Sequence, residues 1–127
     1  MMTSRKITRD VKVVYDKEAV TMDTTTNGSQ FNVQNFVEML IFVETENSGG
    51  TSPTLDIKVQ TKDPKQGNWF DAGIALTQIT GDSTQMKANT LATYGVLIPL
   101  GQFCRLVYTI GGTSPTFDVT ATVVLKS

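Results

Sequence analysis

The hexapeptide Gly-Gly-Thr-Ser-Pro-Thr occurs twice in this chain, at residues 49–54 and 111–116, and a strand-like segment follows each copy. Leu55-Asp56-Ile57 follows the first copy, and Phe117-Asp118-Val119 follows the second. Glycine adopts positive φ without a Cβ clash, and proline fixes its own φ and favours extended geometry in the serine before it. The repeat therefore predicts that the chain reverses at each copy and restarts as a strand.

The segments after the two copies alternate between apolar and polar residues. In residues 55–62 the apolar side chains Leu55, Ile57 and Val59 fall at every second position. Residues 117–126 repeat the pattern, and their apolar positions are Phe117, Val119, Ala121, Val123 and Leu125. A period of two predicts strands with one buried face and one solvent-facing face.

A strand is also predicted before each copy, at residues 36–46 and 103–110, so each hexapeptide is expected to close an antiparallel hairpin. Further strands are predicted at residues 11–15, 19–22, 30–34, 69–71, 74–80 and 94–100. The polar residues 80–93 are expected to form a surface loop. No segment has the apolar spacing of a long helix. Many short strands in one small chain predict an all-β, antiparallel β-sandwich, jelly-roll-like, with an immunoglobulin-like sandwich as the alternative.

Length and charge limit the classes of function. The 127 residues are near the usual size of one domain, so we expect residues 11–127 to form a single β-sandwich domain preceded by an arm at residues 1–10. A formal net charge of −1 gives no indication of nucleic acid as a partner. No apolar run approaches the ~20 residues that cross a bilayer, so no membrane partner is expected.

The residue types that carry catalysis are scarce. The chain has no histidine, which removes the usual serine triad and the commonest metal ligand. Carboxylates such as Glu44, Asp56 and Asp118 fall on the solvent-facing sides of predicted strands. We therefore predict no catalytic residue, no cofactor and no metal, and expect that the protein is not an enzyme.

One predicted strand, at residues 36–46, is apolar on both faces at its centre. The odd positions from Val37 to Val43 form one face, while Phe36, Leu40 and Phe42 lie on the opposite face with glutamates. Loops or the amino-terminal segment of the same chain can cover that second face, or a neighbouring subunit can cover it.

The amino-terminal segment is locally basic. Arg5, Lys6 and Arg9 stand there with one strong hydrophobe, Ile7. Such a segment is either a frayed terminus or an arm that orders against a negatively charged protein surface.

Two single residues have a functional and a structural interpretation. Trp69 follows the turn-rich residues 63–68, and it can serve as a stacking platform for a sugar or as a core residue beneath the turn. The core interpretation is favoured, because large aromatics dominate the cores of small sandwiches. Cys104 alternates in phase with Leu106 and Tyr108, which predicts an inert, buried thiol.

Several of these stretches together resemble a known group of proteins. Residues 105–117, RLVYTIGGTSPTF, and residues 54–60, TLDIKVQ, leading to Gly67-Asn68-Trp69, resemble small structural proteins of tailed bacteriophages, most of all capsid decoration, or cement, proteins. The resemblance covers roughly residues 36–127. Members of that group are compact β-sandwiches that bind the outside of an assembled shell, often as trimers, and they have no catalytic residues to transfer.

The resemblance implies a non-enzymatic virion structural protein that stabilises the capsid exterior. Its implied partners are the major capsid protein and further copies of itself, with a trimer favoured, and its implied location is the capsid surface after synthesis in the host cytoplasm. The residues themselves supply the interface candidates, which are Arg5, Lys6, Arg9, Phe36, Leu40 and Phe42, so residues 1–10 are expected to be flexible or to contact the capsid. The alternative is a carbohydrate-binding module, or a tail, neck or head-fibre β-sandwich.

Overall fold

The structure, a computed structural model, describes residues 10–80, 87–94 and 101–127. Within these ranges every regular element is a strand, which confirms the all-β prediction. The strands are β1 (Val11–Met22), β2 (Thr26–Asn27), β3 (Phe31–Asn32), β4 (Glu38–Lys62), β5 (Trp69–Ala75), β6 (Ile79–Thr80), β7 (Lys87–Tyr94) and β8 (Phe103–Lys126). The arm residues Arg5, Lys6 and Arg9, and the predicted strand at 94–100 beyond Tyr94, lie outside the described residues.

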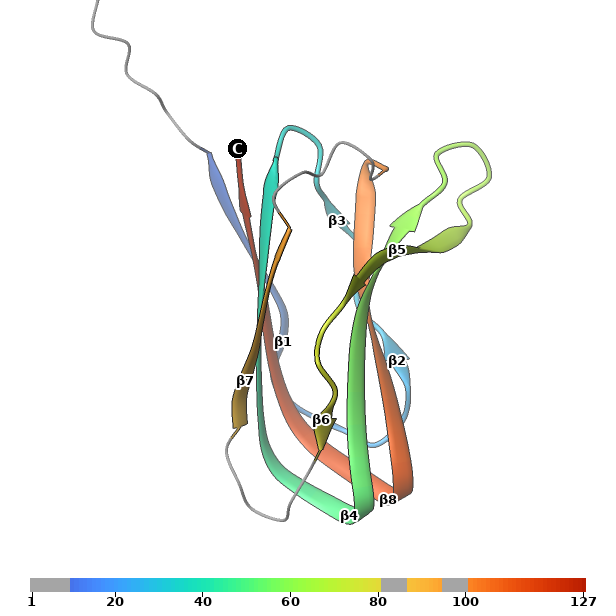
Figure 1. Cartoon of the computed structure of the whole chain (residues 1–127). Coiled ribbons are helices and arrows are strands. Elements are labelled where there is room, and N and C mark those ends of the chain that lie inside the picture. The colour runs from blue at the N-terminus through green and yellow to red at the C-terminus, as the bar shows by residue number, and fades with distance from the viewer. Residues whose placement is uncertain (1–9, 81–86, 95–100) are drawn as a thin grey trace, which may run out of the picture.

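Two long strands, β4 and β8, form the centre of the fold. They pair antiparallel along their whole lengths, from Glu38 opposite Lys126 to Thr61 opposite Cys104. Figure 1 shows both strands running down one side of the molecule, turning together at its lower end and running back up the other side. The hairpin prediction is therefore wrong, because the segments before and after each hexapeptide do not pair with each other: each hexapeptide bends one continuous strand, and the two bent strands pair with one another.

The bend depends on backbone conformations that the hexapeptide supplies twice. Its second residue has positive φ in both copies, 90° at Gly50 and 112° at Gly112. Its fourth residue repeats this, with 48° at Ser52 and 47° at Ser114. Left-handed residues of this kind kink a strand, and the ladder between β4 and β8 shifts register here. The sequence signal for a turn was real, but the chain uses it to fold a sheet over on itself.

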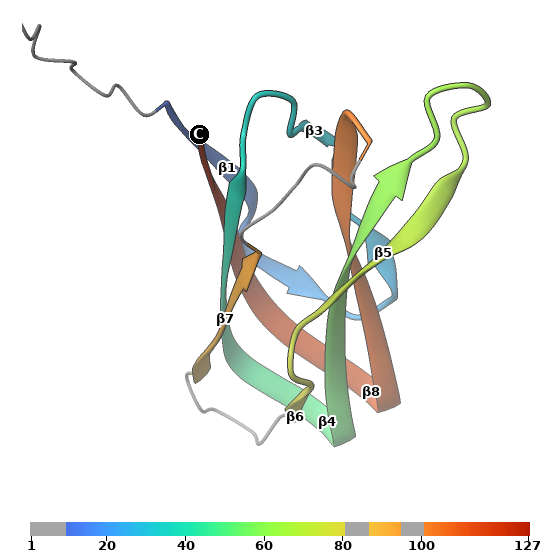
Figure 2. The same cartoon turned by 45° about the horizontal axis from the view of Figure 1, so that its top comes forward.

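Folding the sheet over produces two packed layers. The first contains β7, residues 38–46 of β4, residues 117–126 of β8, and β1, in that order. The second contains β5 and β6, residues 54–62 of β4, residues 103–111 of β8, and β2 with β3. Figure 2 shows the two layers facing each other, joined at the bend by β4 and β8. The sandwich prediction is confirmed.

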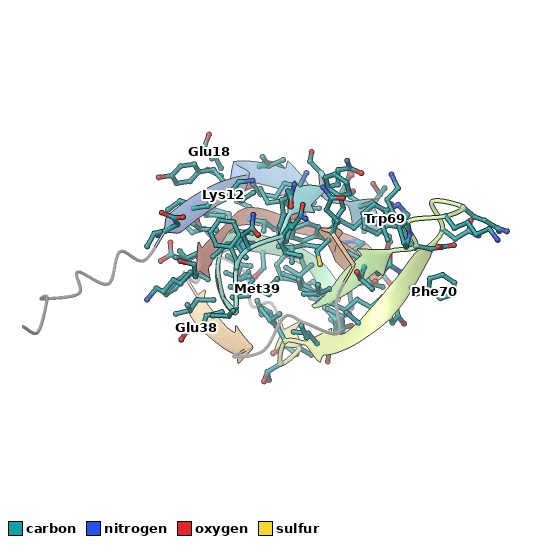
Figure 3. The ribbon with its side chains drawn as sticks, turned by 90° about the horizontal axis from the view of Figure 1, so that it is seen from above. Lys12, Glu18, Glu38, Met39, Trp69 and Phe70 are labelled. Carbon is teal, nitrogen blue, oxygen red and sulfur yellow. The ribbon has the colours of Figure 1, made fainter. Side chains whose placement is uncertain are left out.

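The core lies between the two layers and follows the predicted alternation. Odd positions of β4 point inward in the first layer, and Met39 is labelled on that inner side in Figure 3. The buried apolar side chains of the two long strands that form this core are Met39, Ile41, Val43, Leu55, Ile57, Val59, Cys104, Leu106, Tyr108, Phe117, Val119, Ala121, Val123 and Leu125. Alternation is a local property of a strand, so the sequence identified these inward faces even where the pairing was wrong.

Several predicted strand boundaries differ from the structure. The strands expected at 11–15 and 19–22 form one bulged strand, β1, in which Ala19 has a φ of 49°. The segments expected at 69–71 and 74–80 form β5 and the short β6. β7 occupies residues 87–94, most of which the sequence placed in a polar surface loop.

A part-buried hydrogen bond ties β1 to the second layer. The Tyr108 hydroxyl donates to Oδ2 of Asp16 at 2.5 Å, and the Ser29 backbone N–H donates to Oδ1 of the same carboxylate at 3.2 Å. Burial raises the pKa of Tyr108 far above its usual value, and the Asp16 carboxylate adds to the rise. The phenol therefore stays protonated and remains a donor. Nothing in the sequence indicated this pair, because the two residues come from strands whose proximity depends on the complete topology.

Candidate functional site: the outer face of the first layer

The solvent-facing side of the first layer carries an apolar patch that spans three strands. Val13 of β1 and Leu40 of β4 both lie opposite Val124 of β8. Two residues further along each strand, Tyr15 and Phe42 both lie opposite Thr122. Residues directly opposite each other in a ladder project to the same face. We call the set Val11, Val13, Tyr15, Leu40, Phe42 and Val124 the apolar patch.

The apolar patch is accessible. Tyr15 is 66% exposed and Phe42 is 43% exposed, and Val11 and Val13 are also exposed. Within the described residues no loop lies over these side chains, so intramolecular cover of this face is not seen there. Contiguous exposed apolar surface on one sheet face marks a contact site for another molecule more often than isolated exposed residues do.

Phe36 does not belong to this face. It was expected to share the outer side with Leu40 and Phe42, but it precedes β4 and packs, half-buried, against the core. Asn35, with a φ of 72°, redirects the chain just before it. The alternation that relates Leu40 to Phe42 therefore does not extend back to Phe36.

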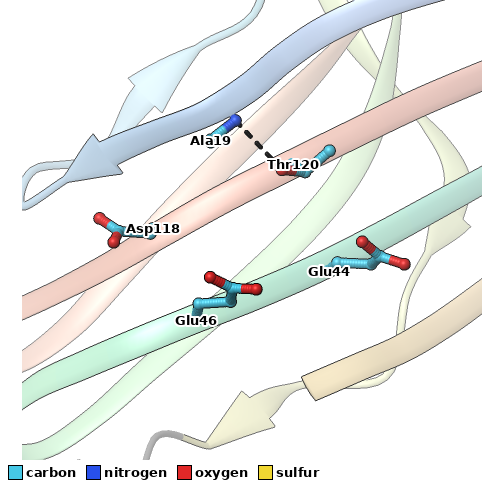
Figure 4. Close-up of a pocket in the computed structure, with 5 residues that line it drawn as sticks. All are labelled: Ala19, Glu44, Glu46, Asp118 and Thr120. Atoms are coloured by element: carbon cyan, nitrogen blue, oxygen red, sulfur yellow. Dashed lines mark hydrogen bonds between the residues drawn. The ribbon is translucent and has the colours of Figure 1, made fainter. Parts of the chain in front are cut away.

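Toward the bend, the same outer face becomes acidic. Glu44 and Glu46 of β4 and Asp118 of β8 gather there, and with Ala19 and Thr120 they line a shallow pocket (Figure 4). The Ala19 backbone N–H donates to Oγ1 of Thr120 at 3.1 Å, drawn as the dashed line. We call Glu44, Glu46 and Asp118 the acidic zone.

Asp118 is held in its charged form. The Thr21 hydroxyl donates to its Oδ1 at 2.6 Å, and the Asn47 side-chain amide donates to its Oδ2 at 2.9 Å. These hydrogen bonds, that from Thr21 first, lower the pKa of Asp118 below its usual value. No lysine or arginine among the described residues forms an ion pair with the acidic zone. The acidic zone therefore presents three carboxylates that have no ion-pair partner among the described side chains.

The amino-terminal arm leaves the sandwich at the opposite end of this face. The Asp10 backbone N–H donates to Oγ of Ser127 at 2.8 Å, and the Ser127 N–H donates to the Asp10 carbonyl at 3.0 Å. Asp10, the first described residue, therefore lies at the end of this face that carries the apolar patch and away from the acidic zone.

Trp69 lies on the outer face of the second layer and not in the core, so the favoured interpretation of this residue is wrong. The Arg105 guanidinium carbon stands 4.4 Å from the centre of the Trp69 ring, and Lys62 Nζ stands 5.7 Å from it. Arg105 Nε also donates to the Gln60 side-chain oxygen at 3.0 Å. Because Arg105 stacks on one ring face, that face is not available to a sugar. Phe70, next to Trp69, points away from the sandwich and is 58% exposed (Figure 3).

Other reactive side chains of the described residues include a thiol and a paired carboxylate. Cys104 is buried, as expected, and burial raises the pKa of its thiol to about 11. Asp71 forms an ion pair with Lys58 at 3.0 Å on the outer face of the second layer. In the described ranges, no group of three or more Cys, Asp or Glu side chains is placed to hold a metal ion. The same ranges contain no helix of the length and apolarity needed to span a membrane.

Sequence reasoning found Leu40 and Phe42 but missed the β1 and β8 contributions to the apolar patch. Val13 and Tyr15 were recognised only as members of a short strand, since the strand beside which they lie cannot be read from local pattern. The acidic zone was interpreted as dispersed solubilising charge for the same reason. A cluster that depends on pairing between distant segments becomes visible only in the folded molecule.

Comparisons with known proteins give a likeness of fold. No protein-family model matches the chain, and no curated protein sequence matches it significantly. The crystal structure of the SPBc2 prophage-derived protein YomS is similar over 98% of this chain and 100% of its own, with a TM-score of 0.59 and 16% identity.

Two structures from infectious bursal disease virus are also similar. The Gx strain structure and the VP2 subviral particle each match 93% of this chain with a TM-score of 0.51, at 10% and 11% identity. This chain spans about a third of the length of those viral chains, 32% in each case. Likeness at such identities indicates a shared β-sandwich fold.

Proposed function

We propose that this protein is a non-enzymatic virion structural protein that binds and stabilises the exterior of a phage capsid as a decoration, or cement, protein. The observation that carries the proposal is the apolar patch, an exposed surface spanning β1, β8 and β4 on the outside of a well-packed sandwich. Burying such a surface against another protein removes apolar area from water and so stabilises the complex.

The fold supports the same class of function. One similar structure is of a prophage-derived protein and another is of a subviral particle. The strand order also supports the jelly-roll form over the immunoglobulin-like one. β1 and β7 flank the β4–β8 pair in one layer, while β2 and β3 flank it opposite β5 and β6 in the other, as two interlocked Greek keys require.

Stabilisation follows from mass action. A protein that binds the assembled shell but not its separated subunits lowers the free energy of the shell by its own binding free energy. Contacts that are weak singly then sum over many copies. The partners in this proposal are the major capsid protein and further copies of this chain, with a trimer favoured. The protein acts on the virion surface after synthesis in the host cytoplasm.

The direct test mixes the purified protein with undecorated capsids and measures co-sedimentation and the temperature of DNA release. We expect binding and a higher release temperature for the wild-type protein, and loss of both for Phe42→Asp. Phe70→Asp is the matched control, since Phe70 is an aromatic outside the apolar patch that is even more exposed than Phe42. Absence of wild-type co-sedimentation would overturn the proposal.

Copy number separates decoration from a role in the tail, neck or head fibre, which the same sandwich can also fill. Mass spectrometry of purified virions should give a number of copies close to that of the major capsid protein. A handful of copies per virion would favour the tail or neck position instead.

A further inference from the structure

The outer face of the first layer is apolar at one end and acidic at the other. The apolar patch lies near the end where Asp10 meets Ser127, and the acidic zone lies near the bend. Glu38 lies opposite Lys126 at the terminal end, and Glu44 follows six residues later on the same strand. At about 3.3 Å per residue, the acidic zone begins roughly 20 Å from the point where the arm leaves the sandwich.

The arm is the chemical complement of this face. It carries three cations, Arg5, Lys6 and Arg9, and one strong hydrophobe, Ile7. The face carries an apolar surface and three carboxylates that form no ion pair with a described side chain. We propose that residues 1–9 of one copy lie across the outer face of the first layer of a neighbouring copy, with their cations on the acidic zone. This inference rests on the proposed self-association and assigns its contact surfaces.

The arm of the same copy cannot make this contact. β1 enters the sheet at Val11 already heading toward the bend, so an arm that returns over its own face must first reverse direction. A β-turn uses four residues, which leaves Lys6 and Arg5 only one or two residues beyond it, about 3–7 Å along the face. The acidic zone begins roughly 20 Å away, so only the arm of another copy can place its cations there.

The chemistry of the contact predicts its dependence on salt. Exposed ion pairs each contribute little, and the screening length falls to about 10 Å at 0.1 M salt. The apolar patch therefore has to supply part of the attraction, while the charges fix which end of the arm lies over which end of the face. Two copies can exchange such arms about a two-fold axis, or successive copies can pass them on around a ring such as a trimer when the rotation between copies permits.

The test measures the mass of the purified protein by light scattering at low salt, without capsids. The wild-type chain should have a multiple of its 13.9 kDa mass, and the multiple should fall as salt is added. Reversing charge on either side, with Arg5→Glu/Lys6→Glu or with Glu44→Lys/Glu46→Lys, should give the monomer mass. Combining the two pairs in one chain should restore the oligomer, which a mere folding defect would not do.

A matched control changes the same charge on the other layer. Asp56→Lys/Asp71→Lys alters the net charge as much as Glu44→Lys/Glu46→Lys, but on the outer face of the second layer, and it should leave the oligomer intact. A wild-type monomer, or an oligomer that survives both charge reversals, would overturn the inference. Capsid co-sedimentation of the same proteins is scored separately, so a protein that oligomerises but does not bind shells contradicts only the proposed function.

Discussion

Thr51 lies directly opposite Thr113, and the two are the third residues of identical hexapeptides on strands that run in opposite directions. The pairs on either side repeat the relationship, since Gly49 faces Thr116 and Thr54 faces Gly111. The two copies are therefore related by a local two-fold axis between Thr51 and Thr113. The sequence repeats here because each copy is the packing partner of the other.

This reciprocity predicts a high cost for side chains at Gly50 and Gly112. A Cβ at Gly50 would stand 2.6 Å from the Thr113 carbonyl oxygen, and one at Gly112 would stand 2.7 Å from the Ser52 carbonyl oxygen. Each glycine also has positive φ. We expect Gly50→Ala or Gly112→Ala to lower the free energy of unfolding by about 3 kcal/mol, measured by urea denaturation.

Gly73→Ala is the control for those two substitutions. Gly73 has a φ of 78°, but no atom lies within 4 Å of the position its Cβ would take. Only the backbone preference is lost there, so we expect a cost of about 1 kcal/mol. Equal costs at the three glycines would show that the close approach of β4 and β8 at the bend has no energetic weight.

The Tyr108 hydroxyl should contribute measurably to stability. Tyr108→Phe removes a buried donor to the Asp16 carboxylate, and hydrogen bonds to charged groups contribute about 1.5–3 kcal/mol. We expect a loss near 2 kcal/mol in urea denaturation. Tyr15→Phe, at a 66% exposed phenol, should change stability by less than about 0.5 kcal/mol. A neutral Tyr108→Phe would contradict the proposed link between β1 and the second layer.

Asp118 should make stability depend on acid. Its pKa is lower in the folded protein than its usual value, so its contribution is present above about pH 4 and is lost as pH falls through the lower, folded value. Asp118→Asn lacks that titration. The difference in urea midpoint between wild type and Asp118→Asn should therefore be largest near neutral pH and should close in acid, whereas a constant difference would refute the assignment.

Arg105 should shield the single tryptophan of the chain. Removing the guanidinium with Arg105→Ala exposes the ring face on which it stacks, so acrylamide should quench Trp69 fluorescence more strongly than in the wild type. Lys58→Ala, on the same outer face but away from the ring, should leave quenching unchanged. If wild-type quenching already equals that of a free tryptophan, the stacked geometry is wrong.

The sequence predicted what depends on neighbouring residues. Leu55, Ile57 and Val59 are buried as the period of two required, because alternation is set by the backbone of the strand itself. The same logic found Leu40 and Phe42 on the outer face. The prediction for Phe36 was wrong, since the positive φ of Asn35 breaks the strand geometry on which the alternation depends.

The sequence did not predict what depends on distant partners. Glycine and proline have the same local signature in a hairpin turn and in the bend of a continuous strand, and the choice between them is made by the opposing copy of the hexapeptide. The apolar patch joins β1, β4 and β8 residues, and the acidic zone joins β4 and β8 residues, that are far apart in the chain. Their members were visible as residues, but their grouping was not.

The pairing of β4 with β8 also sets the speed at which the fold can form. No tight turn connects these strands, and even their nearest pair, Thr61 with Cys104, encloses about forty residues. A sheet built on such distant pairs must close large loops before the free energy of its contacts offsets the lost chain entropy. We therefore expect refolding on the millisecond-to-second scale of high-contact-order proteins, with the central ladder assembled late and as one cooperative unit.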